Sequence, residues 1–196
     1  LGEYLDYVRS SKEYDKTLFV LYGDHAAQLS RSQFGSFVNY DFLTGEQKTE
    51  EDPTYVDYDY YTNELFKKTP LIIWSKDKKV QGKVSYPMGM IDCLPTLSNM
   101  LNIENKYALG HDIFDVKNNN TVVFANGNFL TNKVYYNNSK NESRILDGVE
   151  TLDDNYIDDR KKYAEDILTI SNDIIVYDLI EKEVYKDKEN GGKKHE

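Results

Sequence analysis

The chain has 196 residues, enough to bury a core in one domain, and carries 24 Lys and Arg against 34 Asp and Glu, a net charge of −10. This acidic balance argues against nucleic acid as a partner, because phosphate backbones are bound by a surplus of basic side chains. A single cysteine, Cys93, excludes an intrachain disulfide framework, and no apolar run reaches the ~18–20 residues that a membrane span needs.

The first twelve residues have apolar side chains at helical spacing, with Leu1, Leu5 and Val8 on one face. We expect a helix here that leads into a strand, as in half of a βαβ unit. The chain has no initiator Met and opens within this predicted helix, so we expect it to be a fragment of a longer protein.

Residues 17–25 are the most informative stretch of the sequence. Five consecutive apolar or aromatic residues, 18–22, are typical of a strand buried on both faces of a parallel sheet. The run stops at Gly23, and Asp24 and His25 follow at once. Because ligands of open α/β sheets bind beyond the carboxyl ends of the strands, this strand delivers a carboxylate and an imidazole to a functional edge. The spacing alone supports metal binding or catalysis about as well as it supports a structural Asp-His dipeptide, so both interpretations stay open here.

The next segments are polar. Residues 26–39 are small and Ser-rich, which predicts a loop with at most a helical turn. Residues 41–61 are rich in Asp, Glu and Tyr, and we interpret them as a solvated, mobile surface insertion. The alternative, an acidic cation-binding loop, lacks the ladder of ligands and the central Gly of a calcium loop.

A second strand and a short helix follow. Residues 69–74 form a compact apolar run with Pro70 at its start, where a strand tolerates proline, and 75–84 read as a turn or linker. Asp92 is placed to cap a helix that ends by Asn102, with Pro95 in its first turn. Four apolar residues should form the buried stripe of this helix: Leu94, Leu97, Met100 and Leu101.

The C-terminal third predicts a small antiparallel piece and then a helix. Residues 121–125, 128–131 and 133–136 read as short strands, and Asn126-Gly127 is the clearest hairpin turn. Residues 137–154 are polar and irregular. Apolar residues recur at helical spacing over 156–183, with a break near Ser171-Asn172, and a frayed tail is expected over 185–196.

Other residues with reactive side chains have a structural interpretation. His111 follows Gly110 and precedes apolar residues, so a satisfied loop imidazole is favoured over a metal ligand. His195 lies in the tail and is interpreted as incidental. Cys93 sits at a helix start, which could lower the pKa of its thiol, although a packed structural thiol is the favoured interpretation. No Gly-rich phosphate loop or Ser nucleophile elbow supports a nucleotide-binding or serine-hydrolase function.

The order of these motifs resembles the C-terminal half of the sulfatase/alkaline-phosphatase superfamily, and among its members the lipoteichoic acid synthase-like phosphoglycerol transferases. The resemblance rests on five stretches and a late helix, namely 17–25, 69–74, 91–97, 110–114 and 123–129. It implies an α/β fold with a mixed, mostly parallel sheet flanked by helices, a partial alkaline-phosphatase-like sandwich, with a small antiparallel C-terminal piece. Residues 1–184 would be the C-terminal portion of the catalytic domain.

The resemblance also implies a divalent metal, usually Mn²⁺ with Mg²⁺ or Zn²⁺ as alternatives, held by an upstream Glu, a nucleophilic Thr and the pair that matches Asp24 and His25. The nucleophile is expected upstream of this chain, so no catalytic residue is assigned here and the fragment is expected to be inactive alone. The partners would be a lipid phosphate donor and a glycolipid or polymer acceptor, at the extracytoplasmic face of a bacterial membrane, with membrane anchors only upstream. A sulfatase or phosphoethanolamine transferase of the same superfamily, or a non-catalytic domain that kept the fold, are the alternatives.

Overall fold

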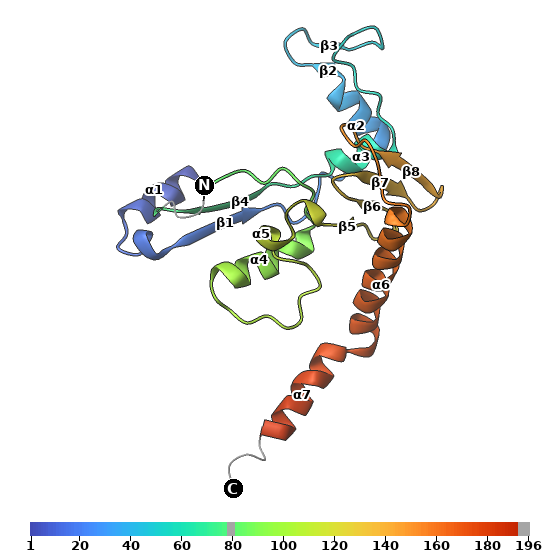
Figure 1. Ribbon diagram of the computed structural model, residues 1–196. Coiled ribbons are helices and arrows are strands. Elements are labelled where there is room, and N and C mark those ends of the chain that lie inside the picture. The colour runs from blue at the N-terminus through green and yellow to red at the C-terminus, as the bar shows by residue number, and fades with distance from the viewer. Residues whose placement is uncertain (78–80, 192–196) are drawn as a thin grey trace. The chain divides into compact units, whose positions relative to one another are not determined.

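The computed structural model describes residues 1–77 and 81–191 of the chain (Figure 1). The chain divides into two compact units, Leu1–Lys83 and Val84–Glu196. The break falls at the end of residues 75–84, which the sequence predicts as a turn or linker.

The first unit is built around a two-stranded ribbon. Its elements in chain order are α1 (Gly2–Ser10), the 3-10 turn η1 (Tyr14–Lys16), β1 (Leu18–Tyr22), α2 (Arg31–Val38), β2 (Tyr40–Asp41), β3 (Glu46–Gln47), α3 (Tyr60–Phe66) and β4 (Leu71–Ser75). The predicted N-terminal helix and both predicted strands are present. Tyr14, Phe19 and Trp74 pack together on this ribbon, with the Phe19 and Trp74 ring centroids 5.0 Å apart.

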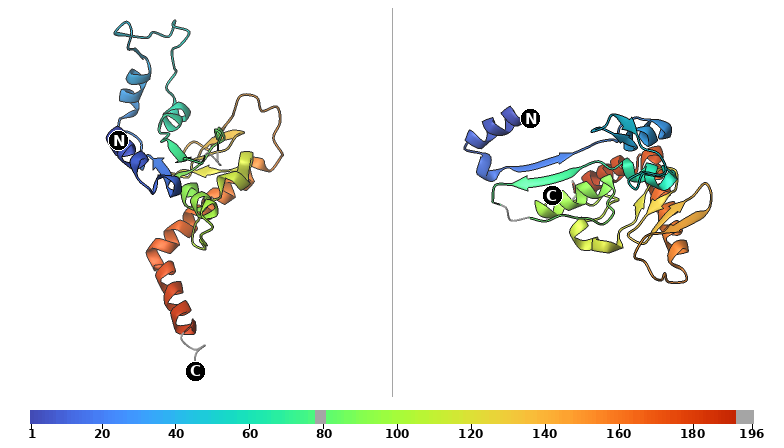
Figure 2. Two further views of the ribbon diagram at one scale, coloured as in Figure 1. Left: turned by 90° about the vertical axis from the view of Figure 1, so that its left-hand side faces the viewer. Right: turned by 90° about the horizontal axis from the view of Figure 1, so that it is seen from above.

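The expected mostly parallel sheet is not found in the described residues. β1 pairs with β4 antiparallel, in a register that runs from Leu18 opposite Ser75 to Tyr22 opposite Leu71 (Figure 2). The connection leaves β1 and enters β4 at the same end of the ribbon, so the two strands must run in opposite directions. Burial on both faces is also wrong for β1, because Phe19 is its only buried residue and Tyr22 is 60% exposed. An apolar run signals a strand but does not encode the direction of its neighbour.

The region predicted as loop and surface insertion contains regular structure. Helix α2 begins with a capping box in which the side chains of Ser30 and Gln33 bond each other's backbone N–H groups. The base of the following insertion is tied by Asn39, whose side chain donates to the carbonyl of Val56 and accepts from its N–H, at 2.9 and 2.8 Å. Arg31 donates to the carbonyl of Tyr58 beside it. The capping box was present in the sequence and is the signal for α2 that the prediction of a loop missed.

The second unit joins a short helical segment to a four-stranded antiparallel sheet. Its elements are η2 (Met90–Asp92), α4 (Cys93–Met100), α5 (Ile113–Val116), η3 (Lys117–Asn119), β5 (Val122–Val123), β6 (Phe129–Leu130), β7 (Val134–Asn137), β8 (Glu142–Ile145), α6 (Tyr156–Tyr177) and α7 (Leu179–Gly191). The sheet order is β5-β6-β7-β8, which confirms the small antiparallel C-terminal piece, while β8 lies in a stretch predicted as irregular. Phe129, Val134, Tyr136 and Ala164 form its core, where α6 packs on the sheet.

Two details of the helices differ from the prediction. The break in the long helix falls at Asp178, which adopts a left-handed conformation (φ 51°), and not at Ser171-Asn172, which the helix accommodates (Figure 1). Residues 185–191, expected as a frayed tail, belong to α7. His195 lies outside the described residues.

Candidate functional site

The turn after β1 presents Asp24 and His25 to solvent. The last ladder pair joins Tyr22 to Leu71, and the Gly23 N–H then donates to the carbonyl of Pro70 at 3.1 Å. Asp24 and His25 come directly after that bond, and their side chains are 82% and 68% exposed. The sequence therefore located the strand end and its two polar residues correctly.

The orientation of the His25 ring suits a metal ligand. Its Nδ1 lies 2.8 Å from the carbonyl oxygen of Ala26, and since a carbonyl can only accept, Nδ1 carries the proton and donates it. In the neutral ring, Nε2 is then left with a free lone pair. Histidine ligands of metals are commonly fixed by such a bond from the second nitrogen to a backbone carbonyl.

The spacing of the two side chains also fits a shared ion. Nε2 of His25 lies 3.8 Å from Oδ1 of Asp24. Two ligands of one divalent ion lie about 3–4 Å apart when each metal–ligand bond is about 2.1 Å long. A carboxylate oxygen with a neutral imidazole is a donor set that suits Mn²⁺ or Zn²⁺.

The pair does not form a complete site by itself. Within residues 1–77 and 81–191, no group of three or more His, Cys, Asp or Glu side chains is arranged to hold a metal ion. Asp24 and His25 would therefore supply two ligands of a larger set.

A second carboxylate, Asp92, has the opposite environment. Its side chain is buried, at 2% exposure. Oδ1 accepts from the N–H of His111 at 2.9 Å, and Oδ2 accepts from the N–H of Gly89 at 2.8 Å and from Nδ2 of Asn120 at 2.7 Å. The carboxylate thus ties three separate backbone segments of the second unit together.

Thr96 and Gly110 complete this buried junction. The hydroxyl of Thr96 donates to the carbonyl of Asp92 at 2.6 Å and accepts from the N–H of Ile113 at 3.1 Å. A Cβ on Gly110 would lie 2.1 Å from the carbonyl oxygen of Ile91, so only glycine permits the approach. The motifs at 91–97 and 110–114 are therefore two halves of one structural clamp, which spacing in the sequence could not reveal.

The predicted roles around α4 need correction. The side chain of Asp92 makes no capping bond to α4, because its oxygens are used by the clamp. The buried residues of the helix are Thr96 and Ser98, while Leu94 and Leu101, expected in the buried stripe, are 57% and 51% exposed. Burial raises the pKa of the Cys93 thiol, so the lowered pKa considered for a helix start is wrong.

The other histidine of the described residues, His111, belongs to the second unit. His111 is exposed and lies before α5, with its ring centroid 6.2 Å from that of Tyr163. Burial raises the pKa of Tyr163, the negative charge of Asp92 raises it further, and Arg160 opposes the shift. His111 therefore lies beside the structural clamp of the second unit.

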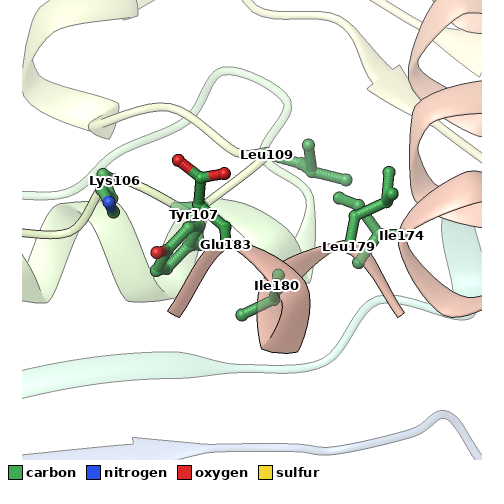
Figure 3. A pocket seen from close by; sticks show the side chains of 8 residues that line it. Lys106, Tyr107, Leu109, Ile174, Leu179, Ile180 and Glu183 are labelled. Carbon is green, nitrogen blue, oxygen red and sulfur yellow. The ribbon is translucent and has the colours of Figure 1, made fainter. Parts of the chain in front are cut away.

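The second unit also contains a cavity of about 280 Å³. It lies where residues 106–109 meet the joint between α6 and α7 (Figure 3). Its lining combines four apolar side chains with three that carry polar groups, namely Leu109, Ile174, Leu179 and Ile180, with Lys106, Tyr107 and Glu183. None of the residues that the sequence assigns to a site lines this cavity. Among the helices of residues 1–77 and 81–191, none has the length and apolar character to cross a bilayer.

Comparison with known proteins supports the resemblance read from the sequence. The family model described as Sulfatase matches residues 1–103. Lipoteichoic acid synthase of Staphylococcus aureus (strain USA300) is 26% identical over 182 residues, which cover 91% of this chain and 26% of the relative. The lipoteichoic acid synthase of Staphylococcus saprophyticus is 26% identical over 183 residues, 92% of this chain and 26% of that protein.

A solved structure shares the fold. The lipoteichoic acid synthase LtaP from Listeria monocytogenes superimposes with a TM-score of 0.58 at 21% identity, over 89% of this chain and 42% of that one. The chain thus spans about a quarter of the length of the curated relatives it matches.

Proposed function

Because the chain belongs to the sulfatase family, we propose that it is the C-terminal portion of a metal-dependent phosphoglycerol transferase. The parent protein would move glycerol phosphate from phosphatidylglycerol to a cell-envelope polymer or glycolipid, at the extracytoplasmic face of a bacterial membrane. Similarity to lipoteichoic acid synthases over nine tenths of this chain supports this branch of the family.

The observation that carries the proposal is the Asp-His pair after β1. Asp24 would contribute a hard anionic oxygen, and His25 a neutral Nε2 whose tautomer is fixed by the bond from Nδ1 to Ala26. Both side chains stay open to solvent, as ligands of an ion shared with other residues would be.

A divalent ion, Mn²⁺ in this proposal, would lower the pKa of a coordinated hydroxyl and neutralise charge on the transferring phosphoryl group. Asp24 and His25 would bind this ion from one side and hold it in place. The nucleophilic Thr and the Glu ligand belong to the upstream part of the parent in this proposal, so the 196-residue chain alone is expected to have no transferase activity.

The test uses the full-length protein in vesicles of phosphatidylglycerol radiolabelled in its headgroup glycerol, with Mn²⁺. We expect release of diacylglycerol and transfer of label to an acceptor, and a loss of at least about 100-fold in Asp24→Ala and His25→Ala. His111→Ala, a substitution of an exposed histidine in the second unit, is the matched control and should keep the wild-type rate.

Two other donors separate the alternatives. Hydrolysis of an aryl sulfate with no transfer from phosphatidylglycerol would identify a sulfatase instead. Transfer from phosphatidylethanolamine alone would identify a phosphoethanolamine transferase. A protein inactive on all three donors in the presence of Mn²⁺, Mg²⁺ or Zn²⁺ would contradict the enzymatic proposal and favour a non-catalytic domain.

A further inference from the structure

The start of β4 lies directly against the turn that carries the Asp-His pair. The Gly23 N–H donates to the carbonyl of Pro70 at 3.1 Å. A Cβ placed on Gly23 would lie 2.8 Å from Cβ and 3.0 Å from Cγ2 of Thr69, so the turn or the Thr69 side chain would have to shift. The side chain of Thr69 therefore packs on the α-carbon of Gly23 with no space between them.

Glycine is required at position 23 because the side chain of Thr69 lies so close to it, and not because of its backbone dihedral angles. Among the residues that the structure describes, the glycines with positive φ are Gly45, Gly82, Gly127 and Gly148, and Gly23 is not one of them. An L residue could adopt its backbone conformation if Thr69 were smaller. A larger residue at position 23 should therefore be tolerated once the side chain of Thr69 is removed, which a second substitution can test.

The Asp-His pair follows this contact directly in the chain. Asp24 and His25 are the first residues beyond the last bond of the ribbon, and both side chains are largely exposed. The ring of His25 bonds to its own neighbour Ala26, which moves with it. The contact of Gly23 with Thr69 and Pro70 is therefore the point where the turn meets the strand pair, one residue before Asp24.

We propose that Thr69 and Pro70 are positioning residues for the metal-ligand pair. By holding Gly23 against the end of the ribbon, they keep the carboxylate of Asp24 and Nε2 of His25 close enough to bind one divalent ion together. The inference rests on the proposed function, because it takes Asp24 and His25 as metal ligands.

The test measures Mn²⁺ binding locally by NMR on the 196-residue chain. Bound Mn²⁺ broadens the ring-proton signals of His25, and the Mn²⁺ concentration that halves their intensity reports the affinity of the pair. In Gly23→Ala the added Cβ meets Thr69 and shifts the turn, so we expect this concentration to rise about tenfold. Gly2→Ala is the matched control, since a Cβ there meets nothing within 4 Å.

A second substitution at Thr69 tests whether Gly23→Ala weakens Mn²⁺ binding through this contact or by destabilising the protein in general. In Gly23→Ala/Thr69→Gly the obstructing side chain is gone, and the affinity should return to that of Thr69→Gly alone. If Gly23→Ala does not fold, two variants of Thr69 decide the question. Thr69→Val keeps the shape and should bind as wild type, whereas Thr69→Ser loses the packed methyl group and should bind about two- to threefold more weakly.

The outcomes distinguish this inference from the proposed function. Broadening of His25 that is equal in wild type, Gly23→Ala and Thr69→Ser would overturn the positioning role and leave the metal pair intact. An affinity in Gly23→Ala/Thr69→Gly below that of Thr69→Gly alone would also overturn it. A wild-type chain in which Mn²⁺ does not broaden His25 at all would overturn the metal pair, and the positioning role with it.

Discussion

Two turns of this chain carry an Asp beside a closely packed glycine, yet their carboxylates have opposite environments. Asp24, after Gly23, is 82% exposed and lies 3.8 Å from the His25 ring. Asp92, whose neighbour Ile91 packs on Gly110, is 2% exposed and accepts three hydrogen bonds. Residue type is therefore a poor guide to role here. A carboxylate whose lone pairs are used by neutral donors holds the fold, and one whose lone pairs face solvent is open to a ligand.

Gly23 and Gly110 differ in the kind of atom that lies against them. A Cβ on Gly23 would meet the side chain of Thr69, while a Cβ on Gly110 would meet the backbone of Ile91. A side chain can be removed by a second substitution and a backbone carbonyl cannot. Only the first glycine should therefore have a suppressor.

The largest effect should separate the two carboxylates. Asp92→Ala removes the acceptor of three hydrogen bonds, from the N–H groups of Gly89 and His111 and from Nδ2 of Asn120, and should lower the free energy of unfolding by about 4 kcal/mol. Asp24→Ala removes an exposed side chain and should leave the unfolding midpoint unchanged while abolishing Mn²⁺ binding at His25. Urea unfolding followed by circular dichroism measures the first difference, and equal midpoints in both variants would contradict the distinction.

A somewhat smaller loss is expected for Gly110→Ala. The added Cβ must displace the carbonyl of Ile91, which we expect to cost about 3 kcal/mol of unfolding free energy. Thermal unfolding measures this loss. Gly89→Ala is the control within the same junction, because the nearest atom to its Cβ is a flexible side chain at 3.5 Å. An equal effect of the two substitutions would mean that the approach at Gly110 is not as tight as described.

Thr96 tests the hydroxyl that links the two halves of the clamp. Thr96→Val keeps the volume but loses the bond to the Asp92 carbonyl and leaves the Ile113 N–H without its acceptor, so we expect a loss of about 1–2 kcal/mol. Thr96→Ser keeps the hydroxyl and should lose less. The order would be reversed if Thr96 acted only by filling space, since valine preserves the methyl group of threonine and serine does not.

The smallest effect is a pH dependence of stability that arises at Tyr163, beside Asp92. Burial and the charge of Asp92 raise the pKa of Tyr163 above its usual value of 10.0, so the folded state holds the phenol proton more tightly than the unfolded chain. This contribution to stability is complete below pH 10.0 and is lost as the pH rises through the folded-state pKa. Tyr163→Phe should flatten the fall in unfolding free energy above that pH. Identical profiles in the two proteins would rule out this contribution.

Local features of the sequence predicted a good part of this structure. The strand ending at Tyr22, the strand at 71–75, the hairpin at Asn126-Gly127 and the position of Asp24 and His25 follow from short patterns of apolar and turn residues. These patterns act over a few residues and so can be read one segment at a time.

The missed features depend on contacts between distant segments. The antiparallel direction of β4 follows from the path of residues 23–70. The role of Asp92 follows from its hydrogen bonds to His111 and Asn120, which lie 19 and 28 positions further along the chain. The break at Asp178 is set by a single left-handed residue and not by the polar pair earlier in the helix. No local pattern encodes such long-range contacts. The sequence around Asp92 therefore predicts a helix cap, although the carboxylate holds the clamp together.

The most direct test of the account compares two histidines in one NMR spectrum of the 196-residue chain. Mn²⁺ is added in small steps while the ring-proton signals of His25 and His111 are followed. The signals of His25 should broaden at much lower Mn²⁺ than those of His111, and Asp24→Asn should remove this preference. Equal broadening of the two histidines, or a preference that survives Asp24→Asn, would contradict the assignment of Asp24 and His25 as a metal-ligand pair.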